Sequence, residues 1–377
     1  MDGIQRYDSF ATMPAETLAV FERAAQSADF FLSPAWLRYL AQSTLAQQGR
    51  LRLYCLYRDG APRILLPLMQ QEQARGRQRL ASPSNYYSAL AGPLMVAPTI
   101  DGHALGEMIA AIAAERPRWE RIDLRPLAPE AVCFKQLQRA LDDSGLAVQP
   151  YFCFGNWYLD VAGRSYAQYH AGLPSRLRNT LARKTQQLRA SGQVELEIVT
   201  GGAALDRVID DYQAVYLASW KKPEPYPDFM PGLMRLCAEL GKLRLGVVRI
   251  DGQPVAAQVW IVHHGVAAIY KLAYDARVAA LSVGSVLTAA LMEHVIDIDR
   301  VHQVDYLMGD DRYKQDWMSH RRERWGLMAF NLSTLDGLSG YARHVGGQLF
   351  RRLERGLPEG LRTGNTFQFW RGFAGRK

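Results

Sequence analysis

The same strand–turn–strand pattern occurs twice in the chain, once in each half. Residues 51–53, Leu-Arg-Leu, lead to the dipeptide Asp59-Gly60, and residues 243–245, again Leu-Arg-Leu, lead at the same spacing to Asp251-Gly252. Asp-Gly between two apolar runs is typical of a β-hairpin with a tight turn. The repeat therefore predicts two copies of one folding unit.

The order of the elements after each hairpin supports a duplication. A helical stretch comes next, followed by a short strand at 121–124 in the first half and at 303–306 in the second. A chain of 377 residues is long enough for two domains. We expect a turn near Pro150 and Gly155-Asn156 and a new strand from Trp157. The predicted parts are a first module at 1–155, a catalytic module at 156–335 and a basic helical tail at 336–377.

The periodicity of the second half predicts a mixed α/β domain. Apolar residues at helical spacing, together with Gly and Pro at the ends, separate helices from strands. The expected order is helix 174–191, strand 194–199, helices 203–220 and 230–240, hairpin 243–262, strand 266–274, helix 283–298, and strands 302–307 and 324–332. Helices that precede a meander and then alternate with strands are typical of a mixed sheet.

Charge is unevenly distributed along the chain. The net charge is +8, yet 161–194 holds six basic and no acidic residues, and 338–377 holds eight basic and two acidic residues. Either region could bind phosphates, an acidic substrate or a membrane surface. No apolar stretch reaches the roughly 20 residues of a membrane-spanning helix, so a cytoplasmic protein is expected. The four cysteines lie apart from metal-ligand spacing, and we expect no metal.

A series of short stretches in the second half resembles a known family. They are RLRN at 176–179, YLASW at 216–220, GKLRLG at 241–246, DGQPVAA at 251–257, YKLAYD at 270–275, Gly284 before a helix, and GDDRYKQDW at 309–317. The ordered series resembles the GCN5-related N-acetyltransferase (GNAT) fold. It is more similar to the acetyltransferase domain of CelD-type proteins, which are linked to exopolysaccharide synthesis and related to FemAB aminoacyl transferases. The resemblance implies an α/β fold with a mixed sheet, tandem GNAT-like modules and a basic C-terminal helical tail.

The resemblance also implies a binding site for acetyl-CoA or another acyl-CoA as co-substrate. The pantetheine arm would lie along a strand, and the pyrophosphate would bind the free N–H groups of a helix N-terminus. The residues implied for these two roles are Tyr270, Lys271, Leu272 and Ala273 on the strand, and Ser282, Val283, Gly284 and Ser285 at the helix. The helix entrance has one glycine, whereas the family usually has Gly-x-Gly or Gly-x-Ala there. The alternatives are an ordinary core strand and a simple serine cap.

Acyl transfer requires groups that stabilise the oxyanion, protonate the leaving thiolate and deprotonate the attacking amine. Lys314 and Tyr313 stand in a context similar to that of FemAB-like enzymes, and Asp305 and Asp310 are candidate bases. Asp310 beside Asp311 would have a raised pKa if the two carboxylates shared a site, but not in an exposed turn. The residues expected to contact the acceptor are Arg176, Arg178, Trp220 and Lys221, for which a solvated helix face and a core tryptophan are the alternatives.

These inferences predict an acyl-CoA-dependent N-acyltransferase that transfers an acyl group, acetyl by expectation, by direct attack on the thioester. The acceptor would be an amine of a sugar, a polysaccharide precursor or a small metabolite. The first module would be degenerate, since Arg125-Pro126-Leu127 stands where the second has Tyr313-Lys314. Two alternatives stay open. One is a FemAB-like transferase that uses aminoacyl-tRNA. The other is a non-catalytic scaffold of an exopolysaccharide system, with its basic tail on a membrane.

Overall fold

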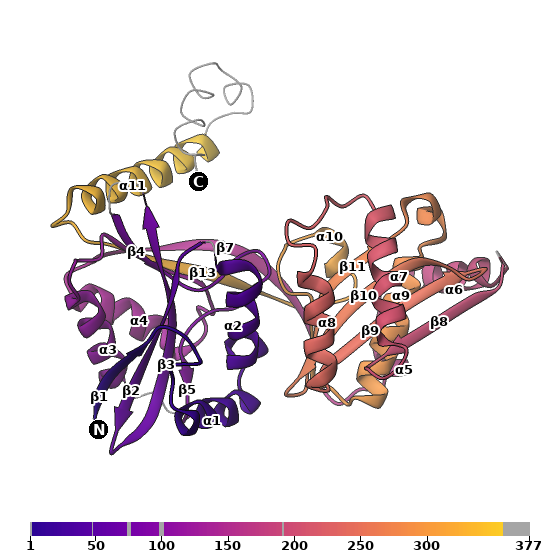
Figure 1. The fold of residues 1–377 in the computed structure, drawn as a ribbon. Coiled ribbons are helices and arrows are strands. Elements are labelled where there is room, and N and C mark those ends of the chain that lie inside the picture. The colour runs from indigo at the N-terminus through magenta and orange to yellow at the C-terminus, as the bar shows by residue number, and fades with distance from the viewer. Residues whose placement is uncertain (1, 47, 74–76, 98–101, 191, 357–377) are drawn as a thin grey trace.

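The computed structural model describes residues 2–46, 48–73, 77–97, 102–190 and 192–356. Two α/β modules lie side by side and share one continuous mixed sheet (Figure 1). The predicted fold class, an α/β fold in which tandem modules share a mixed sheet, is confirmed.

The first module begins with β1, and two helices lead from it to the hairpin. Its strands are β1 (Gly3–Tyr7), β2 (Arg50–Arg58), β3 (Ala61–Gln73), β4 (Arg77–Ala81), β5 (Leu94–Met95) and β6 (Arg121–Leu127). Its helices are α1 (Ala15–Ala24), α2 (Pro34–Leu40), α3 (Gly102–Ala114) and α4 (Val132–Asp143).

The second module repeats this order after the long strand β7 (Ala147–Asp160). Its remaining strands are β8 (Val194–Val199), β9 (Leu243–Ile250), β10 (Gln253–His263), β11 (Val266–Tyr274), β12 (Gln303–Asp305) and β13 (His320–Phe330). Its helices are α5 (Tyr166–Ala171), α6 (Ser175–Ala190), α7 (Leu205–Ala218), α8 (Phe229–Glu239), α9 (Val283–Glu293) and α10 (Arg312–Gln315). The predicted elements of this half are thus present, with shifts at their ends.

The sheet has the same strand order when it is followed inward from either end. The order is β1-β2-β3-β4-β6-β13-β7-β12-β11-β10-β9-β8, so the repeated hairpins occupy matching places. Both hairpin turns adopt the left-handed backbone that Asp-Gly favours, with φ of 51° and 71° at Asp59 and Gly60 and of 49° and 76° at Asp251 and Gly252. The predicted hairpins are confirmed.

The two central strands are exchanged between the modules. β7 and β13 pair antiparallel along their length, from Tyr158 opposite His320 to Ala147 opposite Phe330. The end of β7 also pairs with β12, whereas 325–330 of β13 pair with β6. Each central strand therefore starts in one module and ends in the other, and the expected division at 155/156 falls inside β7.

The turn predicted near Pro150 and Gly155-Asn156 is wrong, because β7 runs straight through these residues. Pairing with β13 overrides the local turn signal. Gly155 has a different reason to be glycine. A Cβ atom there would lie 2.8 Å from the Asp310 carboxylate and 2.7 Å from the Arg321 guanidinium.

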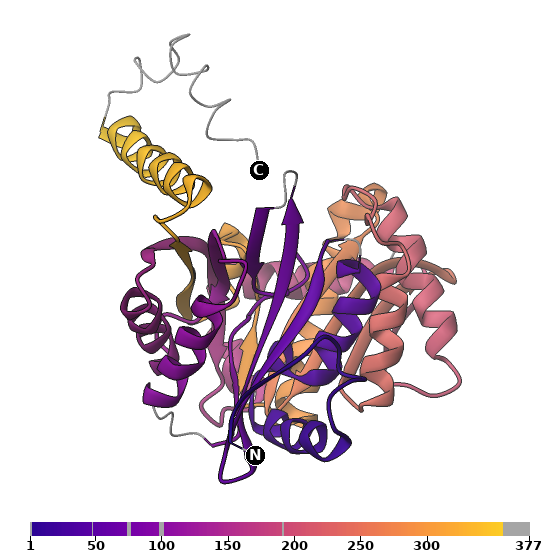
Figure 2. The ribbon, with the colours of Figure 1, turned by 60° about the vertical axis from the view of Figure 1, so that its left-hand side comes forward.

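Helices α2 and α8 join the modules through a shared core. Trp36 and Tyr39 of α2 pack against the ring of Phe229 at centroid distances of 6.2 and 5.3 Å, and the Tyr39 hydroxyl donates to the Phe229 carbonyl at 2.6 Å. Figure 2 shows α1 and α2 on the side of the second module, with α3 and α4 on the other side of the first module's strands. The central core therefore contains residues of both modules.

The tail begins with α11 (Leu335–Gly356), so the predicted helix is present up to residue 356, whereas 357–377 lie outside the described residues. Its first turn exposes apolar surface, with Leu335 88% and Leu338 50% exposed. Val345 is partly buried, and the side chains of Leu349 and Leu353 lie outside the described residues. No helix in the described part of the chain is long and apolar enough to cross a membrane.

Candidate active site

The second module contains an open wedge between β11 and β12. The two strands pair in parallel only from Val266 to Ala268, opposite Gln303 to Asp305. β11 then continues to Tyr274, paired with β10 alone among the described strands, and a bulge interrupts that register at Tyr270. Bulges bend a strand and re-aim its side chains. The outer edge of 269–274 is therefore available to pair with an extended amide chain.

The matching place in the first module is closed by its own chain. β4 and β6 pair over 79–81 and 121–123, and the segment that follows β4 then continues along β6. The Ser82 amide donates to the Asp123 carbonyl at 2.9 Å, and the Ala91 amide donates to the Pro126 carbonyl at 2.7 Å. Within the described residues, the open wedge is therefore a feature of the second module.

Helix α9 begins beside the end of β11. Ser282 has a φ of 51° and separates the short 3-10 helix Ala276–Leu281 from α9. The first-turn N–H groups of an α-helix have no partner inside the helix, and they favour anions. Gly284 packs closely on Tyr274. A Cβ atom added at Gly284 would lie 3.1 Å from that ring. Of the four residues predicted here, Val283 is fully buried in the core, and Ser285 donates its amide to the Ser282 carbonyl at 2.9 Å.

The four residues predicted on β11 point to different surroundings. Tyr270 stacks on Phe31 and donates to the Tyr87 carbonyl at 3.0 Å, and burial raises its pKa well above the usual value. Leu272 and Ala273 pack into the cores on opposite faces of the sheet. Lys271 instead forms an ion pair with Glu224, with 2.9 Å between Nζ and Oε1. Of these side chains, Lys271 is the one with a charge beside the wedge.

Lys314 is buried beneath the turn that follows β12, with 4% of its surface exposed. Its ammonium donates to the carbonyls of Met308 at 2.7 Å and Gly309 at 3.3 Å, and Asp311 Oδ2 lies 3.3 Å away. Burial lowers its pKa, which Asp311 partly offsets. A lysine used in this way holds the backbone of the wedge in shape.

Tyr313, the neighbour of Lys314, is 46% exposed. Its ring meets Tyr306 edge to face at 5.8 Å, and burial raises its pKa to about 12. The hydroxyl therefore keeps its proton at neutral pH. The two predicted catalytic neighbours thus differ in exposure, since a helix turns successive side chains to different sides.

Both predicted carboxylate bases are already engaged by arginines. Asp305 is buried, accepts from Asn156 Nδ2 at 2.5 Å and from the Leu307 amide at 2.6 Å, and pairs with Arg322. Asp310 accepts from Arg321 Nη2 at 2.7 Å, and this hydrogen bond lowers its pKa. The raised pKa considered for an Asp310–Asp311 pair is therefore absent at Asp310.

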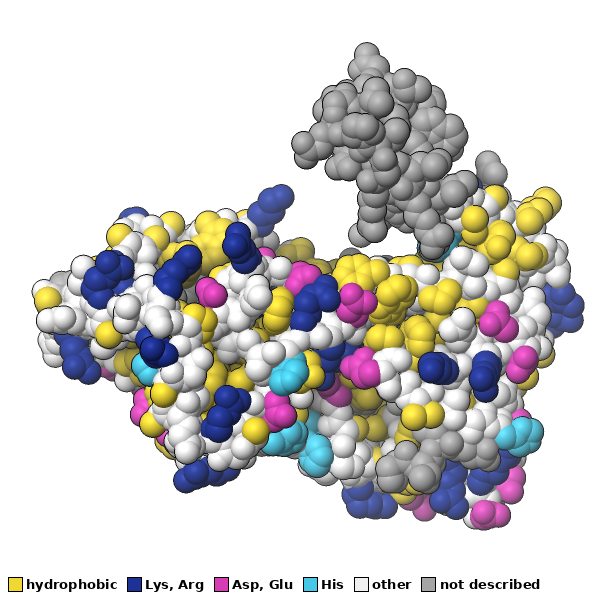
Figure 3. Space-filling view, turned by 180° about the vertical axis from the view of Figure 1, so that it is seen from behind, with side chains coloured by type: hydrophobic (Ala, Val, Ile, Leu, Met, Phe, Trp, Pro, Cys, Tyr) yellow, Lys and Arg dark blue, Asp and Glu magenta, His cyan; other side chains and the backbone are white. Residues whose placement is uncertain are grey.

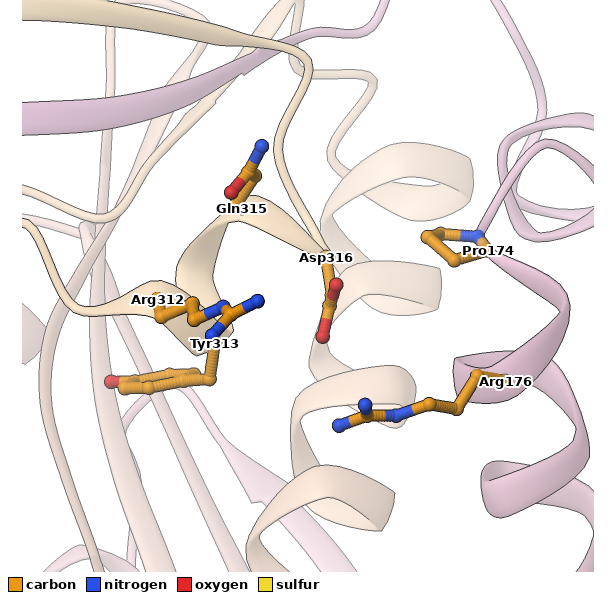
Figure 4. Close-up of a pocket in the computed structure, with 6 residues that line it drawn as sticks. All are labelled: Pro174, Arg176, Arg312, Tyr313, Gln315 and Asp316. Carbon is orange, nitrogen blue, oxygen red and sulfur yellow. The ribbon is translucent and has the colours of Figure 1, made fainter.

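A pocket of about 630 Å³ lies between the start of α6 and α10. Figure 4 shows the side chains that line it, which are Pro174, Arg176, Arg312, Tyr313, Gln315 and Asp316. Two guanidinium groups in one pocket suit phosphate oxygens. Arg178 has another role, because its Nη1 donates to the carbonyls of Ala171 and Leu173 at 2.6 and 2.8 Å. On the face seen in Figure 3, single Lys and Arg side chains are scattered over the half that holds the second module.

Trp220 and Lys221 lie at the open end of the wedge. Trp220 is 55% exposed and packs on Tyr274 with 4.5 Å between ring centroids. Lys221 Nζ lies 5.7 Å from the Trp220 ring and 5.9 Å from the Tyr216 ring. Burial, together with the charge of Lys271, lowers the pKa of Lys221 to about 8.

Sequence reasoning missed a cluster that joins the two modules at the wedge. Glu224 Oε2 accepts from the hydroxyls of Tyr87 at 2.5 Å and Tyr86 at 3.2 Å, while Oε1 accepts from Lys271. Burial raises the pKa of Glu224, but the hydrogen bonds from Lys271 and Tyr87 outweigh it and the pKa falls. The available signals were a carboxylate between Pro223 and Pro225 and two adjacent tyrosines in the first module.

The family comparison matches this part of the chain. Residues 175–315 match the model of the acetyltransferase (GNAT) domain. This segment is therefore similar to GNAT domains. It runs from the start of α6 to the end of α10, and so it contains the wedge, the start of α9 and the pocket-lining residues of α10. The expected enzyme class, an acyltransferase, is confirmed by the match.

Solved structures extend the likeness to both modules. FemX is 8% identical with a TM-score of 0.58, covering 86% of this chain and 96% of its own. The C-terminal domain of a lysylphosphatidylglycerol synthetase from Agrobacterium fabrum is 14% identical with a TM-score of 0.53, covering 88% and 96%. L-PGS from Bacillus licheniformis is 12% identical with a TM-score of 0.51, covering 84% and 91%. These values show a shared fold. The comparison with curated proteins gives no match.

Metal-ligand groupings are absent from the described residues, where no three His, Cys, Asp or Glu side chains could hold an ion together.

Proposed function

We propose that this protein is an acyl-CoA-dependent N-acyltransferase whose donor binds in the wedge of the second module. The observation that carries the proposal is the open edge of β11 beyond Ala268. The matching place in the first module is filled by the chain segment that follows β4. An extended amide chain such as pantetheine can pair with such an edge. The α9 N-terminus and the pocket of Arg176 and Arg312 would then hold the phosphates.

In the proposed reaction, the acceptor amine attacks the thioester carbon directly. The C–N bond forms, the C–S bond breaks, and the sulfur leaves with the electron pair. Tyr313 keeps its proton at neutral pH and would donate it to the thiolate. We assign Lys314 a positioning role, because its ammonium is bound to the carbonyls after β12. The donor that we propose is acetyl-CoA. The proposed acceptor is an amine of a sugar, a polysaccharide precursor or a small metabolite.

Calorimetric titration of the full chain with acetyl-CoA, CoA and longer acyl-CoAs tests the donor. We expect micromolar binding, and release of the CoA thiol when amino sugars and other primary amines are added. Absence of binding by every CoA species would overturn the proposal.

Aminoacyl-tRNA is the second candidate donor, and the likeness to FemX and to lysylphosphatidylglycerol synthetases favours it. The basic helix α6 would then contact the nucleic acid. Incubation with charged tRNA and candidate acceptors separates the two donors. Aminoacyl transfer that RNase abolishes, without binding of acetyl-CoA, would support this candidate.

We also propose a membrane contact through the tail, because the exposed Leu335 and Leu338 lie in the first turn of α11, which leads into the basic segment 338–377. Sedimentation with vesicles containing phosphatidylglycerol tests this contact. We expect binding that deletion of 338–377 abolishes, and binding that survives the deletion would contradict it.

A further inference from the structure

The transfer reaction needs a base, and the two aspartates predicted for this role are held by arginines. Asp305 pairs with Arg322, and Asp310 pairs with Arg321. A carboxylate that already accepts several hydrogen bonds is a poor proton acceptor. Glu224 is engaged in the same way by Lys271 and Tyr87. The base must therefore be sought among other groups at the wedge.

Lys221 lies in the loop between α7 and α8, next to the exposed Trp220. The charged groups that act on it are Lys271 from β11, Glu224 from its own loop, and Lys314 and Asp311 from α10 and the turn before it. The faces of Trp220 and Tyr216 flank its ammonium. Since Trp220 also packs on Tyr274 at the end of β11, Lys221 stands at the open end of the wedge.

The ammonium of Lys221 differs from its neighbours in having no carboxylate partner. Lys271 is paired with Glu224 and Lys314 with Asp311, whereas Lys221 Nζ forms no ion pair with any described residue. Its pKa of about 8, lowered by burial and by Lys271, leaves part of the side chain uncharged at neutral pH. An uncharged lysine amine is a competent proton acceptor.

We propose that Lys221 is the general base that deprotonates the acceptor amine. This inference rests on the proposed function. Lys221 takes one proton from the acceptor ammonium, and the freed nitrogen lone pair forms the C–N bond to the acyl carbon. The C–S bond breaks, and the departing sulfur receives a proton while the nitrogen of the adduct loses one. The products are the amide and the CoA thiol, and Lys221 returns its proton to solvent.

The competing role for Lys221 is a fixed positive charge that binds an anionic group of the acceptor. The variants Lys221→Arg and Lys221→Met separate the two roles. Arginine keeps the charge but does not give up its proton, so it replaces a binding cation and fails as a base. The exposed neighbour Lys222 supplies the control Lys222→Met.

The test measures release of the CoA thiol from acetyl-CoA, with glucosamine and hydroxylamine as probe acceptors. At neutral pH glucosamine is mostly protonated, whereas hydroxylamine is mostly uncharged and needs no base. We expect both Lys221 variants to lower kcat with glucosamine by about 100-fold or more, and with hydroxylamine by less than about threefold. Full activity of Lys221→Arg with glucosamine would overturn the proposal.

Two further measurements keep this test separate from the proposed function. Acetyl-CoA binding should be the same in wild type, both Lys221 variants and Lys222→Met. Absence of acetyl-CoA binding in the wild type would contradict the proposed donor and not the role of Lys221. NMR of ¹³C-methylated lysines reports the titration of Lys221 without any acceptor. The resonance that Lys221→Met removes should titrate near pH 8, and titration above about pH 10, as in free lysine, would overturn the proposal.

Discussion

Lys271 and Glu224 form an ion pair of 2.9 Å that ties the edge strand of the wedge to the loop between α7 and α8. The side chains are 19% and 10% exposed, so the pair is mostly shielded from water. Tyr86 and Tyr87 of the first module bond to the same glutamate. The wall of the candidate site is thus built by both modules.

Removing the charge of this glutamate should weaken the whole wall. We expect Glu224→Gln to lower the free energy of unfolding by about 1–3 kcal/mol, because a shielded Lys271 loses its partner. Urea unfolding measures the change. The matched control is Glu22→Gln at the exposed Arg38–Glu22 pair, with side chains 42% and 51% exposed, where we expect less than about 1 kcal/mol. Equal effects in the two variants would contradict a special role for Glu224.

Lys314 should matter for stability as well as for donor binding. Lys314→Met leaves the carbonyls of Met308 and Gly309 without their donor, so we expect a loss of about 1–3 kcal/mol in urea unfolding. Acetyl-CoA affinity should fall in the same variant as the wedge relaxes. Tyr313→Phe removes only a hydroxyl and should unfold like the wild type. A fully stable Lys314→Met would refute the positioning role.

The two arginines of the pocket should bind the phosphates of the donor. We expect Arg176→Gln and Arg312→Gln each to weaken acetyl-CoA binding about tenfold, or about 1.4 kcal/mol, because a charged hydrogen bond is lost. Calorimetry at low and high salt gives both the affinity and its salt dependence. Arg183→Gln on the exposed side of α6 is the control and should bind as the wild type does. Unchanged affinity in both pocket variants would show that the phosphates of the donor bind elsewhere.

Acid should remove the contribution of the Asp310–Arg321 pair to stability. Arg321 holds the pKa of Asp310 below its usual 3.8, so the folded state binds this proton less readily than the unfolded state. The contribution is present above pH 3.8 and is lost as the pH falls through the lower pKa that Asp310 has in the folded state. We therefore expect the stability difference between wild type and Asp310→Asn to shrink below about pH 4. A difference that does not shrink in acid unfolding curves would contradict this expectation.

The exchange of β7 and β13 should make the modules dependent on each other. Residues 156–335 alone lack β6 and the first half of β7, which are the partners of 325–330. An unpaired apolar strand is poorly stable and prone to associate with other chains. We expect this fragment to lack a cooperative unfolding transition by circular dichroism, whereas the full chain shows one. Cooperative unfolding of the fragment would show that its part of the sheet folds independently.

The sequence by itself determined the repeated unit and most elements of the second half. The Asp-Gly turns, the helix at 175–190 and the strand at 266–274 follow from backbone preferences and from apolar periodicity, which act between near neighbours. Tertiary structure decided the rest. β7 continues through Pro150 and Gly155, and Lys314 is buried under the turn after β12. Tyr87 of the first module donates a hydrogen bond to Glu224 of the second. These contacts link residues far apart in the chain, so the burial and partners that set their energies have no local signature.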